Sequence, residues 1–211
     1  MFKAIRNLTA TALLNTMQAC GHKVFDGELN LNIIGIRHAN TRANTFNDAI
    51  CVLYQQGGEW QLKQYKATTD AGLYWRRHPM NVDGTAVLIA GQHKSLWTLG
   101  FHQGKYRALV QHKPVVVLRD NNQDTELDTD VTPQAVLQQG YFGINCHRAN
   151  SKTTSTQVDK WSAGCQVFAN PNDFDEFIAL CEQSAAKYGP YFTYTLLEQA
   201  EIKESNDHGV S

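Results

Sequence analysis

DAICVLYQQGGEWQLKQYKA, at residues 48–67, is the most informative segment of this chain for its architecture. Two apolar-rich runs, 48–55 and 60–67, flank the turn residues Gly57 and Gly58. Glycine reaches the positive φ of a tight turn at no steric cost, so the pattern predicts a β-hairpin. Short apolar runs separated by turn residues continue on the C-terminal side, which is typical of a sheet. We therefore expect a mainly β structure from Leu29 onward.

Other segments complete the expected α+β, mainly β class. Helical spacing of apolar residues predicts an N-terminal helix from Phe2 to Gly21, and a second helix should begin at Asn170 and end at Gly189. We expect a helical segment at 1–28, a main domain at 29–197 and a partly disordered polar tail at 198–211. Further strands are expected at 31–37, 85–90, 95–101, 106–111, 114–119, 165–168 and 191–197, with a second turn at 103–104.

Composition excludes several classes of protein. The chain has 211 residues, 42% hydrophobic and 18% charged, with a formal net charge of −1, enough for one domain with a real core. A nucleic-acid binder needs clustered Lys and Arg, which this chain lacks, so we expect no nucleic-acid partner. No run reaches the ~18 apolar residues of a membrane span. Polar residues interrupt positions 8–20, so we expect no signal peptide.

The five cysteines, at positions 20, 51, 146, 165 and 181, form no CxxC pair. We predict neither a zinc site nor a disulfide framework and expect most of them to be small buried hydrophobes. Cys165 is the exception, because Gly164 before it lets a substrate approach the backbone closely. Main-chain N–H groups around Gly164 and Cys165 would then face an oxyanion, and His147 would be the base.

The residues alone leave an alternative, in which His147 is an ordinary polar histidine and Cys165 a buried thiol. If 143–147 is a strand, Cys146 faces the core and His147 the opposite surface, because side chains alternate along a strand.

At this point the chain resembles a known family. His147, fourteen residues and then Ser162-Ala163-Gly164-Cys165 are similar to the signature of the L,D-transpeptidase catalytic domain (YkuD-like). The flanking text, GINCHRAN at 143–150 and DKWSAGCQVFANPNDFDEF at 159–177, resembles a wall-active subgroup, as do GTAVLIAGQH at 84–93 and ALVQHKPVVVLRDNN at 108–122. The resemblance spans about 29–197, and only 147–165 is specific. It implies a mixed β-sheet or sandwich fold without a cofactor.

The resemblance also implies roles. Cys165 would attack a peptidoglycan stem-peptide carbonyl, His147 would be the base, and Gly164 would mark the oxyanion site. Ser162 would support the loop and help to orient the imidazole. Passing the acyl group to an amine would make the protein an L,D-transpeptidase, and passing it to water would make it a peptidoglycan hydrolase of the endolysin or effector kind. A third alternative is a wall-binding module with a silent site.

Two positions depart from the family pattern. Ala163 stands where the signature usually has a second His, and Val167 stands where the family commonly has Arg or Asn. We therefore considered Arg148 and Gln166 as substitutes for holding a substrate carboxylate or amide, with Arg favoured for its bidentate grip.

Several other features remain candidates. Trp161 is a candidate for the wall of the site. The loop 76–78, Arg-Arg-His, is a candidate for binding an anionic muropeptide, although such residues are usually just solvated. The acidic stretch 120–128 has the oxygen spacing of a calcium loop but lacks its glycine and its closing acid, so a solvated loop is favoured. We expect stem peptides as partners, reached at the cell wall after export or lysis, and we predict no oligomeric state.

Overall fold

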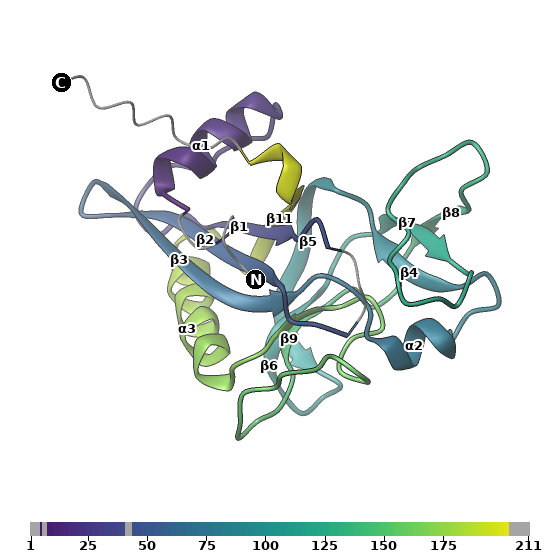
Figure 1. Ribbon diagram of the computed structural model, residues 1–211. Coiled ribbons are helices and arrows are strands. Elements are labelled where there is room, and N and C mark those ends of the chain that lie inside the picture. The colour runs from purple at the N-terminus through teal and green to yellow at the C-terminus, as the bar shows by residue number, and fades with distance from the viewer. Residues whose placement is uncertain (1–4, 6–7, 41–43, 203–211) are drawn as a thin grey trace.

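The computed structural model describes residue 5 and residues 8–40 and 44–202, and these form a closed eight-stranded barrel with a smaller sheet beside it. Around the barrel the strands run β1-β11-β5-β6-β9-β10-β3-β2 (Figure 1). Their bounds are β1 Asn32–Arg37, β2 Asp48–Gln56, β3 Glu59–Thr68, β5 Gly91–His102, β6 Tyr106–Gln111, β9 Cys146–Arg148, β10 Gln166–Phe168 and β11 Tyr191–Glu198. Most neighbouring strands are antiparallel, but β1 pairs with β11, and β9 with β10, in parallel.

The smaller sheet has the order β4-β7-β8, from β4 Thr85–Leu88, β7 Val115–Asp120 and β8 Leu137–Gly140. It projects from one side of the barrel, next to the short helix α2, Leu73–Arg77 (Figure 1). Its two faces pack differently. Val115 and Val117 join the main core, whereas Val87, Leu118 and Leu127 form a cluster of their own. The face carrying Val117 is therefore the one that meets the barrel.

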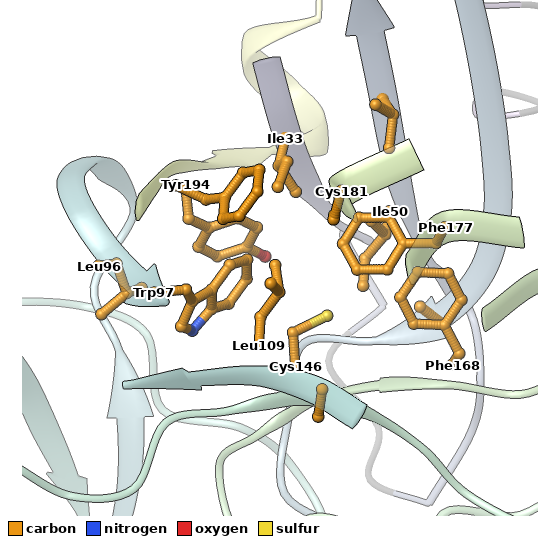
Figure 2. Close-up of a cluster of buried hydrophobic side chains, with 14 of the residues drawn as sticks. Ile33, Ile50, Leu96, Trp97, Leu109, Cys146, Phe168, Phe177, Cys181 and Tyr194 are labelled. Carbon is orange, nitrogen blue, oxygen red and sulfur yellow. The ribbon is translucent and has the colours of Figure 1, made fainter. Parts of the chain in front are cut away.

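The interior of the barrel is the main core, and helix α3, Pro171–Tyr188, packs against it. Trp97 and Tyr194 pack against each other inside it, with ring centroids 4.4 Å apart and planes tilted by 33°, and Phe177 of α3 meets Phe168 of β10 (Figure 2). The sequence explains where α3 begins, because Asn170 caps the first turn through its side chain and Pro follows at the first helical position.

Helix α1, Ala10–Ala19, covers the outer face of β1 and β2. Inward residues of these strands, such as Ile33 and Ile50, belong to the main core, while outward residues such as Ile34 and Cys51 pack with Leu13 of the helix. Both strands are therefore buried on both faces, which explains why their sequences are nearly continuous apolar runs.

The expected class, α+β and mainly β, is confirmed, and so are both hairpin turns, in which residues 57, 58, 103 and 104 have positive φ. The main sheet is mixed, with parallel and antiparallel pairs, and it closes into a barrel. Helix α2 and strand β8 were not predicted from the sequence. The N-terminal helix is shorter than expected, and Phe2 and most of the polar tail lie outside the described residues. None of the described helices is long and apolar enough to cross a membrane.

Candidate active site

The candidate nucleophile and base lie on two neighbouring parallel strands. In the β9–β10 pair, Cys146 is opposite Gln166 and His147 is opposite Val167. The ladder continues one step further, because the Gln166 N–H donates to the Asn145 carbonyl at 2.9 Å. Cys165 comes directly before β10. Residues 147 and 165 are therefore diagonal neighbours, about 8 Å apart between Cα atoms by ordinary strand spacing and rise.

Burial separates the two faces of this pair. Cys146 and Phe168 point into the main core, as Figure 2 shows, whereas Val167 and Cys165 belong to a separate cluster outside the barrel. Alternation then places His147 on the outer face with Cys165. The imidazole and the Cys165 sulfur thus share one face, and Cys146 lies on the other.

The His147 imidazole is held in one tautomer. Its Nδ1 lies 2.8 Å from the Arg148 carbonyl oxygen, which only accepts hydrogen bonds, so Nδ1 carries the proton and Nε2 keeps its lone pair. The ring stacks on His102, with centroids 4.0 Å apart and planes 19° apart. Burial, and secondarily the neighbouring His102, lower the pKa of His147 to about 4. At neutral pH the ring is an uncharged base.

The Cys165 thiol is partly exposed. Its S–H donates to the Gly143 carbonyl at 3.2 Å. Burial raises the pKa of this thiol to about 11, while a hydrogen bond from the Asn145 backbone partly opposes the rise. At rest, therefore, Cys165 is a neutral thiol bonded to a backbone carbonyl rather than a preformed thiolate, and the imidazole on the same face is neutral as well. Attack would require the proton to leave sulfur as the new bond forms.

A tight loop before Cys165 fixes the position of the sulfur. The Ser162 hydroxyl accepts from the Gly164 N–H at 3.1 Å and donates to the Cys165 carbonyl at 2.8 Å. Gly164 has φ +124°, and a Cβ there would lie 2.6 Å from the Ala86 carbonyl oxygen. Only glycine fits this backbone. Ser162 supports the loop as expected, but the imidazole is oriented by the Arg148 carbonyl.

This loop also changes the expected oxyanion donors. The Gly164 N–H is already bonded to the Ser162 hydroxyl. The Cys165 N–H has no hydrogen-bond partner in the described part of the chain. Of the two residues expected to supply donors, Cys165 therefore has the N–H that remains for an oxyanion, and the contribution of Gly164 is its conformation.

Two expected substrate-binding residues are in the wrong place. Arg148 lies on the inward side of β9 with its guanidinium 4.3 Å from the Tyr106 ring, and it contacts Asp175 at 3.4 Å. Gln166 is fully buried, and its Oε1 accepts from the Tyr194 hydroxyl at 2.6 Å. Because residues 146, 148 and 166 alternate away from the outer face, neither side chain reaches a substrate at Cys165.

Trp161 is 42% exposed beside the loop, in a position that fits a site wall. A cavity of about 220 Å³ adjoins the same loop and includes Ala163, Phe142 and Arg119 in its lining. A larger cavity, of about 530 Å³, lies between β7 and the segment leading to β8; Arg119 lines it too, but none of the residues expected at the site does. We regard the smaller cavity as the relevant one, because Ala163 of the loop before Cys165 lines it.

The basic loop and the acidic stretch bind each other. Arg76 is buried, and its Nη2 lies 2.8 Å from an Asp120 carboxylate oxygen and 3.5 Å from one of Asp124. Arg76 is therefore not available to a muropeptide. A calcium ion would have to share both carboxylates with a guanidinium. In residues 5, 8–40 and 44–202, no group of three His, Cys, Asp or Glu side chains could hold a metal ion.

Sequence reasoning missed three residues of this region. His102, at the end of β5, carried no signal, because it stacks on His147 from 45 positions away. Asn145 could have been found, since strand alternation places it on the face of His147. Arg119 carried no signal either, because β7 meets the loop before Cys165 only in the folded chain.

In comparisons with known proteins, no family model, no curated protein and no solved structure matches this chain.

Proposed function

We propose that this protein is a cysteine acyltransferase of the L,D-transpeptidase kind, acting on peptidoglycan stem peptides. The observation that carries the proposal is that Cys165 and His147 share the outer face of two adjacent parallel strands. The thiol is partly exposed, and the imidazole retains an unprotonated nitrogen. The resemblance of 147–165 to the family signature supplies the substrate class, and an L,D-transpeptidase-like fold is part of the same proposal.

The proposed reaction has two halves. In the first, His147 Nε2 takes the thiol proton while the Cys165 sulfur bonds to a stem-peptide carbonyl carbon, and the Cys165 N–H stabilises the oxyanion. The peptide C–N bond then breaks, and the imidazolium returns its proton to the leaving amine. In the second half an acceptor amine loses a proton to His147 and attacks the thioester, which releases the sulfur as a thiol.

The resting pair is neutral on both sides. A base whose pKa is lowered to about 4 is unprotonated at any pH near neutrality. A thiol whose pKa is raised to about 11 keeps its proton at neutral pH. Transfer of that proton to the resting imidazole is uphill, so the scheme requires the proton to leave sulfur only as the new S–C bond forms. Water in place of the amine would give hydrolysis by the same residues, so the acceptor alone separates the transferase from a peptidoglycan hydrolase.

Purified muropeptides and mass analysis of the products test this proposal. The wild-type protein should yield cross-linked products with loss of the leaving group, and Cys165→Ala should yield none. Cys20→Ala is the matched control, because Cys20 is the other partly exposed cysteine and belongs to the cap of α1, away from the site. Cleaved, uncrosslinked products would indicate the hydrolase. Binding without any product would instead indicate a silent wall-binding module and refute the enzyme.

A further inference from the structure

A buried cation without a counterion lies beside the catalytic loop. Arg119 of β7 is 9% exposed. Its Nε donates to the Gln138 side chain at 2.8 Å and its Nη1 to the Gly84 carbonyl at 3.1 Å, both neutral acceptors. Within the described part of the chain its Nη2 has no hydrogen bond and the guanidinium forms no ion pair. Nη2 is not among the described side-chain atoms that are both buried and unpartnered, so this edge of the guanidinium is open to solvent and can be reached by an anion.

The acid that acts on this guanidinium, Asp83, is linked to it through the Gln138 side chain. Asp83 accepts a hydrogen bond of 2.6 Å from Gln138, which in turn accepts from Arg119. This relay holds the Nε edge of the guanidinium, the Gly84 carbonyl holds Nη1, and Asp83 offsets part of the charge. The remaining edge is the one that carries Nη2. An arginine held in this way is preorganised for a carboxylate, because little side-chain entropy remains to be lost on binding.

The register of the small sheet places Arg119 next to the nucleophile loop. Arg119 is the cross-strand partner of Ala86, so the two side chains share a face. The Ala86 carbonyl is the group that closes on Gly164, one residue before Cys165. Phe142, whose ring lies 4.9 Å from the Arg119 guanidinium, directly precedes Gly143, the residue that accepts the thiol hydrogen bond. Arg119 and the sulfur are thus connected through two short segments.

The cavity of about 220 Å³ lies where these segments meet. Arg119 supplies its positive charge, and Phe142, Trp75 and Met80 supply apolar surface. Ala163 completes the wall at the position where the family signature usually has a histidine. A methyl group there leaves space that an imidazole would fill. The cavity therefore combines one cation with mostly apolar walls, and it reaches the loop two residues before Cys165.

We propose that this cavity binds a free carboxylate of the acyl donor, with Arg119 as the anion-binding residue. The donor would be a peptide that carries the carboxylate close to the carbonyl attacked by Cys165. This inference rests on the proposed function for the identity of the donor. It assigns to Arg119 the contact for which Arg148 and Gln166 are wrongly placed.

Calorimetry on the Cys165→Ala protein measures this binding without turnover. The probes are an N-acetylated stem tetrapeptide with free carboxylates and the same peptide with its carboxylates amidated. A charge-assisted hydrogen bond in a buried site predicts roughly 10- to 100-fold weaker binding of the amidated form. The additional substitution Arg119→Gln should bring the two forms within about twofold of each other, and Arg119→Lys should restore part of the difference. Arg107→Gln removes an exposed arginine of β6 and should leave the ratio unchanged.

Equal binding of the two forms to the arginine-containing protein overturns the proposal, and so does a ratio that survives Arg119→Gln. If Arg119→Gln does not fold, Ala163→Leu fills the cavity with the arginine in place and should abolish the preference. The function is judged separately by product formation. Cys165-dependent products made equally from both donors would uphold the enzyme and refute the carboxylate site. A preference for the free carboxylate that depends on Arg119, without any product, would uphold the carboxylate site and refute the enzyme.

Discussion

Lowering the pH from 7 to 4 is expected to destabilise this protein through His147. The folded ring is 4% exposed and stacks on a second imidazole, and burial, followed by the neighbouring His102, lowers its pKa to about 4 although the hydrogen bond to the Arg148 carbonyl opposes the fall. In the unfolded chain the ring has an ordinary pKa of about 6.5. Between pH ~6.5 and 4, therefore, the ring binds a proton in the unfolded state but stays largely unprotonated in the folded state. The free energy of unfolding is unaffected above pH ~6.5 and falls as the pH drops toward 4.

The size of this effect follows from the two pKa values. A difference of about 2.5 units at 1.36 kcal/mol per unit predicts a loss of about 2 kcal/mol by pH 5 and about 3 kcal/mol by pH 4. Asp48 works in the opposite direction, because burial and Asp70 raise its pKa to about 7. Its carboxyl takes up a proton in the folded state first, which adds stability as the pH falls. A comparison of wild type with His147→Gln cancels that contribution, since Asp48 is present in both.

Urea unfolding followed by tryptophan fluorescence at pH 7, 6, 5 and 4 measures the difference. Glutamine keeps a donor for the Arg148 carbonyl but does not titrate. From pH 7 to pH 4 the free energy of unfolding of the wild type should fall by about 3 kcal/mol relative to that of His147→Gln. Repeating the pair in a His102→Gln background should reduce the shift, because His102 is one cause of the lowered pKa. A gap that stays constant from pH 7 to 4 would refute the buried, neutral imidazole.

Three further outcomes follow from the loop that holds the sulfur. Gly164→Ala should lower the free energy of unfolding in urea by about 1–3 kcal/mol, because a Cβ at φ +124° meets the Ala86 carbonyl, and it should remove most of the activity. Unchanged stability would contradict the backbone described. Ser162→Ala should lower the free energy of unfolding by about 1–3 kcal/mol in the same assay, since the Gly164 N–H and the Cys165 carbonyl lose their partner. A change within about 0.5 kcal/mol would argue against this role of Ser162. In a Cys20→Ala background, iodoacetamide labelling of Cys165 should accelerate about tenfold per pH unit from pH 7 to 10, whereas a plateau above pH 8 would indicate a preformed thiolate.

Local pattern was enough to predict most of the strands. Alternation and glycine turns predict both hairpins, and strand β6 has the expected bounds, 106–111. Helix α3 follows from its cap and its proline. The closure of the main sheet does not follow, because it depends on the parallel pairing of β1 with β11, strands that lie about 160 residues apart. No local spacing encodes such a contact.

In the candidate site, too, local pattern predicts some features and long-range contacts decide the others. Strand alternation predicts that Cys146 and His147 face opposite sides, and the core cluster around Cys146 agrees. The same alternation, extended to Arg148 and Gln166, turns both side chains away from the face of Cys165, so their closeness in sequence to the cysteine was misleading. His102 and Arg119 reach the region from β5 and β7. Their roles depend on tertiary contacts that the sequence around 147–165 does not contain.

Trapping a covalent intermediate tests the central claim most directly. Wild-type protein mixed with a stem tetrapeptide and no acceptor amine, quenched in acid and digested, should gain the mass of the donor acyl group on the peptide that contains Cys165. His147→Gln should accumulate this adduct far more slowly, and Cys165→Ala should not form it. An adduct on another residue, or product formation that persists in Cys165→Ala, would contradict the assignment of Cys165 and His147 as nucleophile and base.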